Sequence, residues 1–297
     1  MRVVLLTQIV PVVEGYTEVV ASLGHEIPAV IVGRPFHHQP EAFIAAAGKA
    51  DVVFAASKHS IAALLRAYDA DVGLCTGFPW LVTQEAIDTP PHGIVNGHPT
   101  MLPKGRGPHP WAWAIRNGET ELGMTYHFMD ATFDTGNILA QTPIPIGPDD
   151  TEETLIPAFQ AAAVGLLQEV FAKLEAGDPG LPQVGGEYQR EFEPDYAVVD
   201  LSQPAIEVHR QVRAWSFMPE RIRRGPVTRL RAISSLRRSP PEQVRAACFA
   251  LWVSPNCSSR SRARVLRSAE ESFTVSRIAN RFCSTVIREK MLGSWLR

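Results

Sequence analysis

Short apolar runs alternate with amphipathic stretches through the first hundred residues of the chain. Five runs have the length of buried strands, at residues 2–6, 28–32, 52–55, 72–76 and 93–95. The stretches between them repeat apolar residues at helical spacing, at 15–24, 42–47 and 57–68. Because short buried strands separated by helices are typical of a parallel sheet covered on both faces, the pattern predicts an α/β fold.

The pattern changes after Val95. Residues 108–117 are expected to form a helix that Gly118 closes, and residues 122–129 and 136–144 are expected to form paired antiparallel strands. A long apolar stripe predicts a helix over 151–176, capped by Asp150 with Glu153 completing a capping box. A last helix is expected over 206–215, and no periodicity follows Arg221.

Charge divides the chain near Pro219. The first 219 residues carry 12 Lys and Arg against 26 Asp and Glu, a net charge of −14, which leaves 17 basic and 5 acidic residues, or +12, for 220–297. We therefore predict a catalytic domain over 1–183, a connector and first helix of a C-terminal region over 184–219, and an Arg/Ser-rich tail over 220–297. The tail resembles an out-of-frame extension and is expected to be poorly ordered; the alternative is a functional basic tail for nucleic acid.

Composition excludes several classes of protein. Apolar residues make up 45% of the chain, which is enough for a substantial core. Neither a membrane-spanning apolar run nor a signal peptide is evident, so a cytoplasmic protein without membrane association is expected. The four cysteines have no metal-ligand spacing, and no metal is expected. A dinucleotide cofactor is not expected either, because no G-x-G-x-x-G follows the first strand.

Three polar residues point to chemistry at one edge of the predicted sheet. Asn96 and His98 lie two residues apart at the end of a strand, so that in extended backbone they share a face. Asp134 lies in a turn before Gly136, from which a carboxylate can reach the crevice at the carboxyl ends of the strands. An amide and an imidazole can stabilise the oxyanion of acyl transfer, and a carboxylate can orient the imidazole. A structural strand end with an ordinary turn is the alternative.

A longer run of residues resembles a known family. The run comprises the segments 96–103, Arg106-Gly107, 113–115, Gly118-Glu119, 123–127, Met129-Asp130 and 134–136. In this order it resembles the N10-formyltetrahydrofolate-dependent formyltransferases, which act on methionyl-tRNA, sugar nucleotides or glycinamide ribonucleotide. The resemblance continues more loosely over 1–219. It implies a Rossmann-like domain that uses N10-formyltetrahydrofolate as co-substrate without a metal.

The resemblance also assigns roles to residues. It implies that Asn96, His98 and Asp134 are catalytic. It implies that the folate lies against the residues Phe78, Pro79, Met101, Leu102, Met129, Asp130 and Ala131, although Met101 departs from the commoner Leu. For the second substrate, the candidates are Lys104 and Arg106 as phosphate contacts and Trp215 and Phe217 as stacking groups for a nucleotide base; a solvated loop and core packing are the alternatives.

Several formyl acceptors stay open at this stage. We expect an amino-sugar nucleotide, such as a dTDP-4-amino-4,6-dideoxy sugar, because residues 1–219 are too acidic to neutralise a tRNA backbone. Similar methionyl-tRNA formyltransferases carry a basic insertion after the second strand, where residues 33–40 contain one Arg and no Lys. The alternatives are methionyl-tRNA, water as in a formyltetrahydrofolate hydrolase, and a degenerate binding module. Association into a homodimer is also left open.

The charge division generates the first prediction. A chain ending at Pro219 should fold and keep folate affinity within about twofold of the full chain, because the tail is expected to contribute little to the catalytic core. Circular dichroism and folate titration of both chains check this. Insolubility or loss of folate binding in the shorter chain would make the tail an integral part of the fold.

Overall fold

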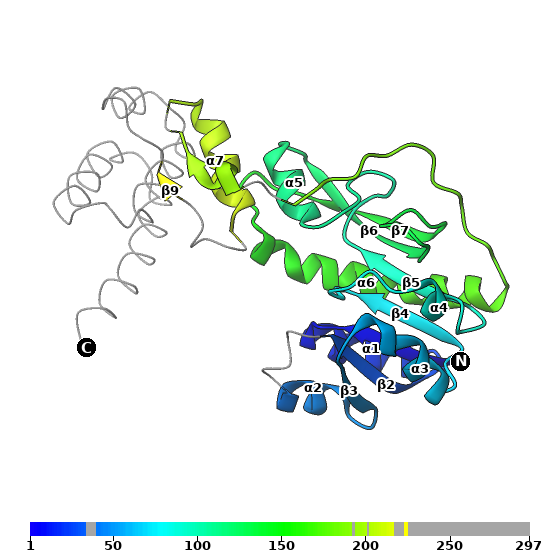
Figure 1. Ribbon diagram of the computed structural model, residues 1–297. Coiled ribbons are helices and arrows are strands. Elements are labelled where there is room, and N and C mark those ends of the chain that lie inside the picture. The colour runs from blue at the N-terminus through cyan, green and yellow to red at the C-terminus, as the bar shows by residue number, and fades with distance from the viewer. Residues whose placement is uncertain (34–39, 192–193, 201, 217–222, 225–297) are drawn as a thin grey trace, which may run out of the picture. The chain divides into compact units, whose positions relative to one another are not determined.

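A computed structural model of the 297-residue chain describes residues 1–33, 40–191, 194–200, 202–216 and 223–224 (Figure 1). The chain forms two compact units, one of residues 1–114 and 119–191 and the other of residues 115–118 and 192–297. The predicted tail, 220–297, lies outside the described residues except for Arg223 and Arg224.

The first unit is built on one seven-stranded sheet with the order β3-β2-β1-β4-β5-β6-β7. The strands are β1 (Arg2–Thr7), β2 (Glu26–Gly33), β3 (Asp51–Ala55), β4 (Val72–Thr76), β5 (Ile94–His98), β6 (Glu121–Phe128) and β7 (Ile138–Pro145). The first five pair in parallel, and β6 and β7 continue the sheet antiparallel. The predicted α/β class with a mostly parallel sheet is confirmed.

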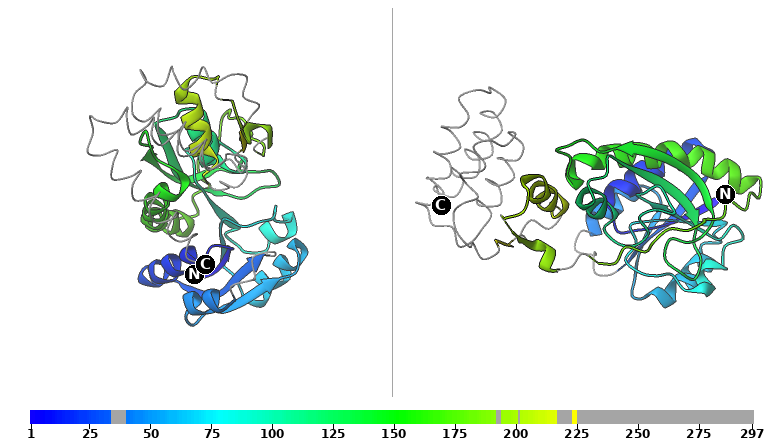
Figure 2. Two further views of the ribbon diagram at one scale, coloured as in Figure 1. Left: turned by 90° about the vertical axis from the view of Figure 1, so that its left-hand side faces the viewer. Right: turned by 90° about the horizontal axis from the view of Figure 1, so that it is seen from above.

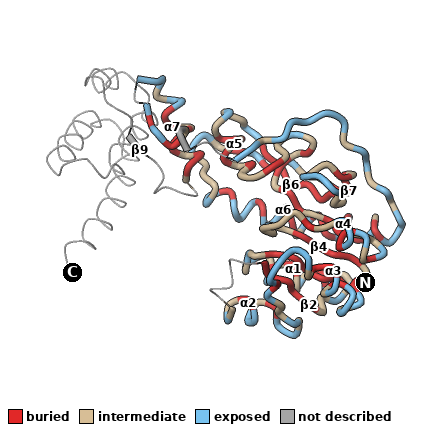
Figure 3. The backbone as a smooth tube through the Cα atoms, in the orientation of Figure 1, coloured by how far each residue is buried: buried red, intermediate tan, exposed pale blue. Residues whose placement is uncertain are grey.

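Helices cover both faces of this sheet, as the views in Figure 2 show. They are α1 (Val10–Ser22), α2 (Pro40–Ala47), η1 (Lys58–Ser60), α3 (Ile61–Ala67), α4 (Gln84–Ile87), α5 (Pro110–Arg116) and α6 (Glu152–Glu175). Side chains of β1 alternate between two cores: Val3 and Leu5 join the cluster with α1, α2 and α6, whereas Val4 and Leu6 join the cluster with α3 and α4. Figure 3 shows the resulting buried strands within more exposed helices.

Three sequence-based expectations about helices were wrong. Helix α1 begins at Val10 and not at residue 15, because a proline is tolerated in the first helical turn. The short α4 was not predicted; Thr83 caps it by accepting a hydrogen bond from Ala86 N. The cap of α6 is Thr151, paired reciprocally with Thr154, whereas Asp150 accepts from Gly147 N at 2.7 Å and from the Thr154 hydroxyl at 2.8 Å.

Helix α6 is long and apolar enough to cross a membrane by length and composition alone. Its buried side chains, among them Phe159, Leu167 and Val170, belong to the core cluster beside β6 and β7. This packing is that of a core helix in a globular domain.

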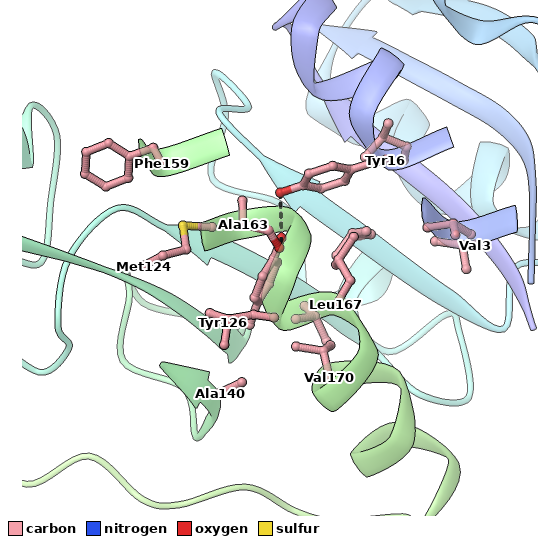
Figure 4. Packing of buried hydrophobic residues seen from close by; sticks show 14 of the residues in the cluster. Val3, Tyr16, Met124, Tyr126, Ala140, Phe159, Ala163, Leu167 and Val170 are labelled. Carbon is pink, nitrogen blue, oxygen red and sulfur yellow. Dashed lines mark hydrogen bonds between the residues drawn. The ribbon is translucent and has the colours of Figure 1, made fainter. Parts of the chain in front are cut away.

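Buried hydroxyl groups join four elements, α1, β4, β6 and α6, and Figure 4 shows the tyrosine pair at their centre. The hydroxyl of Tyr16 on α1 lies 2.6 Å from that of Tyr126 on β6 and 3.2 Å from Thr76 Oγ1 at the end of β4. The Tyr126 hydroxyl also donates to Ala163 O on α6 at 3.1 Å. These bonds satisfy polar groups that would otherwise be costly to bury.

The second unit contains η2 (Pro194–Ala197), β8 (Val198–Val199), α7 (Ala205–Ala214) and β9 (Arg223–Arg224). Strands β8 and β9 pair in parallel. The predicted helix over 206–215 is therefore present with its bounds shifted by one residue.

Two glycines provide a matched stability test. A Cβ at Gly97 would lie 2.7 Å from Met124 Cε and 2.8 Å from Thr76 Oγ1, so Gly97→Ala should destabilise the fold by about 1–3 kcal/mol through overpacking. Gly165 lies within α6 with nothing within 4 Å of its Cβ position, so Gly165→Ala should stabilise by about 0.5–1 kcal/mol. Urea unfolding of both variants checks this, and equal effects would contradict the packing around Gly97.

Candidate active site

The three predicted catalytic residues meet at the carboxyl end of β5. Asn96 and His98 share one face of the strand, and the turn between β6 and β7 places Asp134 against both. Asp134 has φ +56°, a left-handed conformation that Asp tolerates better than most residues. The turn thereby directs a carboxylate that is only 12% exposed into the crevice.

The two carboxylate oxygens of Asp134 have different surroundings. Oδ2 accepts a 2.9 Å hydrogen bond from Gly107 N. Oδ1 lies 3.7 Å from His98 Nδ1, 3.7 Å from His127 Nε2 and 3.5 Å from Asn96 Nδ2. Oδ1 is therefore surrounded by three polar side chains at separations that are long for hydrogen bonds.

The hydrogen bonds of both histidines orient their rings. His98 Nε2 donates to Gly105 O at 2.9 Å, which leaves Nδ1 facing Asp134. His127 Nδ1 donates to Phe128 O at 2.8 Å, so its Nε2 can accept from Asn96 Nδ2 at 3.2 Å. The opposite orientation of the Asn96 amide would place its oxygen against the carboxylate.

Burial and charge set the protonation states. Burial lowers the pKa of His98, although Asp134 and the Gly105 carbonyl oppose this, so the ring is neutral at pH 7 and can accept a proton. Burial raises the pKa of the Asp134 carboxyl, but its interactions with His127, with His98 and with the Gly107 N–H outweigh burial and lower that pKa to about 2. The pair therefore combines a free base with a fixed anion.

His127 and Gln183 belong to this site and were given no role by the sequence analysis. His127 stands opposite Asn96 in the antiparallel pairing of β5 and β6, a register that the order of motifs along the chain does not reveal. Gln183 Nε2 donates to the Asp134 and Gly136 carbonyls at 3.0 and 2.7 Å, which holds the turn. Its signal in the sequence is a single polar residue in a Pro/Gly-rich connector.

The residues predicted to hold a folate fall into two groups. Phe78 and Met129 are partly buried and pack against the core cluster of α3 and α4, Pro79 lies next to Gly33, and Ala131 is exposed. Leu102 is buried, its N–H donates to Thr125 Oγ1, and its carbonyl accepts from Gln141 Nε2.

Met101 and Asp130 are engaged in packing and turn contacts. Met101 lies against Gly123 of β6. The Asp130 carboxylate accepts hydrogen bonds from Thr132 and Thr135 within its own loop. These two residues, like Leu102, are therefore held by contacts within the fold.

The residues predicted to contact the second substrate differ in their surroundings. The Lys104 ammonium pairs with Glu119 at 2.5 Å, and the Arg106 guanidinium donates to Gln183 Oε1 at 2.7 and 3.1 Å. Trp215 is 1% exposed within the second unit and presents no face for stacking on a base, so that expectation was wrong and the alternative core role holds. Phe217 lies outside the described residues.

No group of three or more His, Cys, Asp or Glu side chains within the described part of the chain is arranged to hold a metal ion. His98, His127 and Asp134 are instead committed to one another and to backbone carbonyls.

Parts of this chain are similar in sequence to known proteins. Residues 29–171 match the protein family described as formyl transferase. The similarity to formyl transferases therefore lies in those residues. A GDP-perosamine N-formyltransferase of Brucella melitensis is 38% identical over 154 residues, which cover 51% of this chain and 59% of that protein. A methionyl-tRNA formyltransferase of Symbiobacterium thermophilum is 33% identical over 174 residues, covering 58% and 53%.

Solved formyltransferase structures share the fold. A sugar N-formyltransferase from Shewanella matches with a TM-score of 0.60 and 20% identity, covering 73% of this chain and 88% of that one. HypX from Aquifex aeolicus, solved in complex with tetrahydrofolic acid, matches with a TM-score of 0.58 and 20% identity, covering 74% and 35%. The chain spans about half to three-fifths of the length of the curated formyltransferases named above.

The lowered pKa of the Asp134 carboxyl leads to a test of the site. Because the folded pKa of about 2 lies below the unfolded value of 3.8, ionised Asp134 stabilises the fold above about pH 4, by roughly 2 kcal/mol, and this is lost as pH falls toward 2. Asp134→Asn should remove this component of the acid-unfolding curve and lower turnover at least about 100-fold while the protein stays folded.

Asp88→Asn is the matched control for that variant. Asp88 is exposed at the end of α4 and accepts a hydrogen bond from Gln84, so the acid-unfolding curve of Asp88→Asn should overlay that of the wild type. If the Asp134→Asn protein lost as much stability as the wild type when the pH falls toward 2, the carboxylate would not be the buried anion described above.

Proposed function

We propose that this protein transfers a formyl group from N10-formyltetrahydrofolate to the amine of an amino-sugar nucleotide. The observation that supports this most directly is the convergence of Asn96, His98 and Asp134 on one point at the carboxyl end of β5. The sugar N-formyltransferases among the similar proteins support the acceptor class. The methionyl-tRNA enzymes among them make tRNA the competing acceptor.

The side chains divide the chemistry of acyl transfer. His98 Nδ1 takes the proton that the amine loses on attack, and Asp134 stabilises the imidazolium that results. One N–H of the Asn96 amide is held by His127 Nε2, and the other reaches Asp134 only at 3.5 Å. That second N–H is free to turn toward the oxyanion that develops on the formyl carbonyl. When bound, N10-formyltetrahydrofolate would supply the formyl group, and the proton held on His98 would pass to the departing N10 as the bond between it and the formyl carbon breaks.

The site has the chemistry that a folate requires. Phe78 and Met129 offer partly buried apolar contact for a flat heterocycle, and Phe78 meets Trp80 edge to face with ring centroids 5.5 Å apart. Pro79 and Ala131 lie on the segments that follow β4 and β6. We assign these four residues to the folate, with Met101, Leu102 and Asp130 supporting them through packing and turn contacts.

Charge favours a small acceptor over tRNA. Residues 1–219 carry a net charge of −14, whereas tRNA binding requires a surface that neutralises many phosphates. A diphosphate needs few cations, and Arg106 follows the catalytic strand closely. Its guanidinium is anchored on Gln183, which preorganises it beside the turn that carries Asp134.

The acceptor can be identified with the purified chain. Incubation with N10-formyltetrahydrofolate and a panel of NDP-4-amino-4,6-dideoxy sugars should release tetrahydrofolate, with little dependence on salt because few phosphates are bound. Asn96→Ala and His98→Ala should each lower this rate by roughly 10²–10³, as loss of an oxyanion donor or a proton acceptor does.

Methionyl-tRNA and acceptor-free reactions are the controls. Formylation of methionyl-tRNA at a rate that falls steeply with salt would show that the acceptor is tRNA and not a sugar nucleotide. Release of tetrahydrofolate without any acceptor would indicate a hydrolase. Near-native rates in both alanine variants would show that Asn96 and His98 are not catalytic.

A further inference from the structure

Two large aromatic side chains are exposed next to the catalytic turn. Phe133 and Tyr188 are 49% and 53% exposed, and their ring centroids lie 5.9 Å apart at an interplanar angle of 40°. Such a pair keeps considerable apolar surface in water, and exposed apolar surface beside a polar crevice is typical of a ligand-binding site.

Tyr188 lies directly against the loop that holds the carboxylate. A Cβ added at Gly107 would lie 3.1 Å from Tyr188 Cε2, so the ring edge packs on this glycine. The N–H of the same Gly107 donates to Asp134 Oδ2 at 2.9 Å. Phe133 is the residue before Asp134, and its ring lies against that of Tyr188.

The segment that carries Tyr188 is fixed in place. Residues 181–191, here called the strap, form isolated bridges with the active-site segments, Leu181 with Ile138 and Tyr188 with Arg106. Leu181 exchanges backbone hydrogen bonds with Ile138, Gln183 holds the Asp134 turn, and Gln189 N donates to Arg106 O at 2.7 Å. The aromatic surface is therefore preorganised and loses little side-chain freedom when a ligand binds.

We propose that Phe133 and Tyr188 form an aromatic wall that packs against the apolar face of the acceptor's deoxy sugar ring. This rests on the proposed function and names the residues that recognise its second substrate. The reacting amine is attached directly to the sugar ring, so the ring must lie within a few bonds of Asp134, where the wall stands. A nucleotide base is separated from that amine by the diphosphate and must lie farther away.

The folate also carries a ring system that an aromatic wall could contact, but its candidate contacts are different residues. Phe78 and Met129 pack against the core cluster of α3 and α4. Tyr188 packs on Gly107, beside Arg106 of the same loop. We therefore assign the wall to the acceptor, with Arg106 near enough in sequence and space to meet its phosphates.

Steady-state kinetics with separate titration of each substrate tests the assignment. Tyr188→Ala and Phe133→Ala should each raise the KM for the NDP-4-amino-4,6-dideoxy sugar roughly tenfold, the loss expected for one aromatic contact, with the KM for formyltetrahydrofolate and kcat within twofold of wild type. Tyr188→Phe keeps the ring and should keep the acceptor KM.

Val184→Ala is the matched control, since Val184 is 86% exposed on the same strap and lies outside the wall. It should leave both KM values unchanged. If the acceptor KM is unchanged in both alanine variants, or if the folate KM rises instead, the assignment of the wall to the acceptor is wrong. The proposed function is left in place by that result. Failure of the wild-type chain to formylate any amino-sugar nucleotide overturns the proposed function itself, and the wall's ligand with it.

Discussion

A single buried anion organises this protein's candidate active site. The Asp134 carboxylate keeps its charge at a largely buried position because Gly107 donates to one oxygen and the Asn96, His98 and His127 side chains surround the other. Burial alone would favour the protonated carboxyl, so the Gly107 N–H and the polar side chains around the carboxylate are a condition for the charge. The same anion offsets part of the desolvation that lowers the pKa of His98. Proton acceptor and orienting carboxylate therefore depend on one another.

The scaffold beneath the site explains how this arrangement is held. Gly97 separates Asn96 from His98 and leaves no room for a side chain above Thr76 and Met124. The paired hydroxyls of Tyr16 and Tyr126 connect α1 and β6 beneath the same strand. Position errors of about 1 Å can cost an enzyme much of its rate, so a tightly packed and fully hydrogen-bonded layer under β5 serves the chemistry as well as the stability.

The strap links the catalytic turn to the exposed pair of Phe133 and Tyr188. Gln183 bonds both the Asp134 turn and the Arg106 guanidinium, and the Tyr188 ring lies against the glycine that anchors the carboxylate. The same backbone segments therefore hold the Asp134 carboxylate and the residues proposed to meet the acceptor. A family with several acceptors can change such a strap without altering the strand that carries Asn96 and His98, since loops tolerate substitution better than core strands do.

The sequence by itself determined the alternation of strands and helices, because buried strands and amphipathic helices leave distinct periodicities. It also indicated Asn96, His98 and Asp134 as a group, because they stand in an ordered run of motifs that resembles the formyltransferases. Only the tertiary structure decided what surrounds them. His127 faces Asn96 through an antiparallel register, Trp215 is buried where a stacking group was expected, and Tyr188 reaches Gly107 from 81 positions farther along the chain. Such contacts depend on how distant segments pack, and no local pattern of residues encodes that.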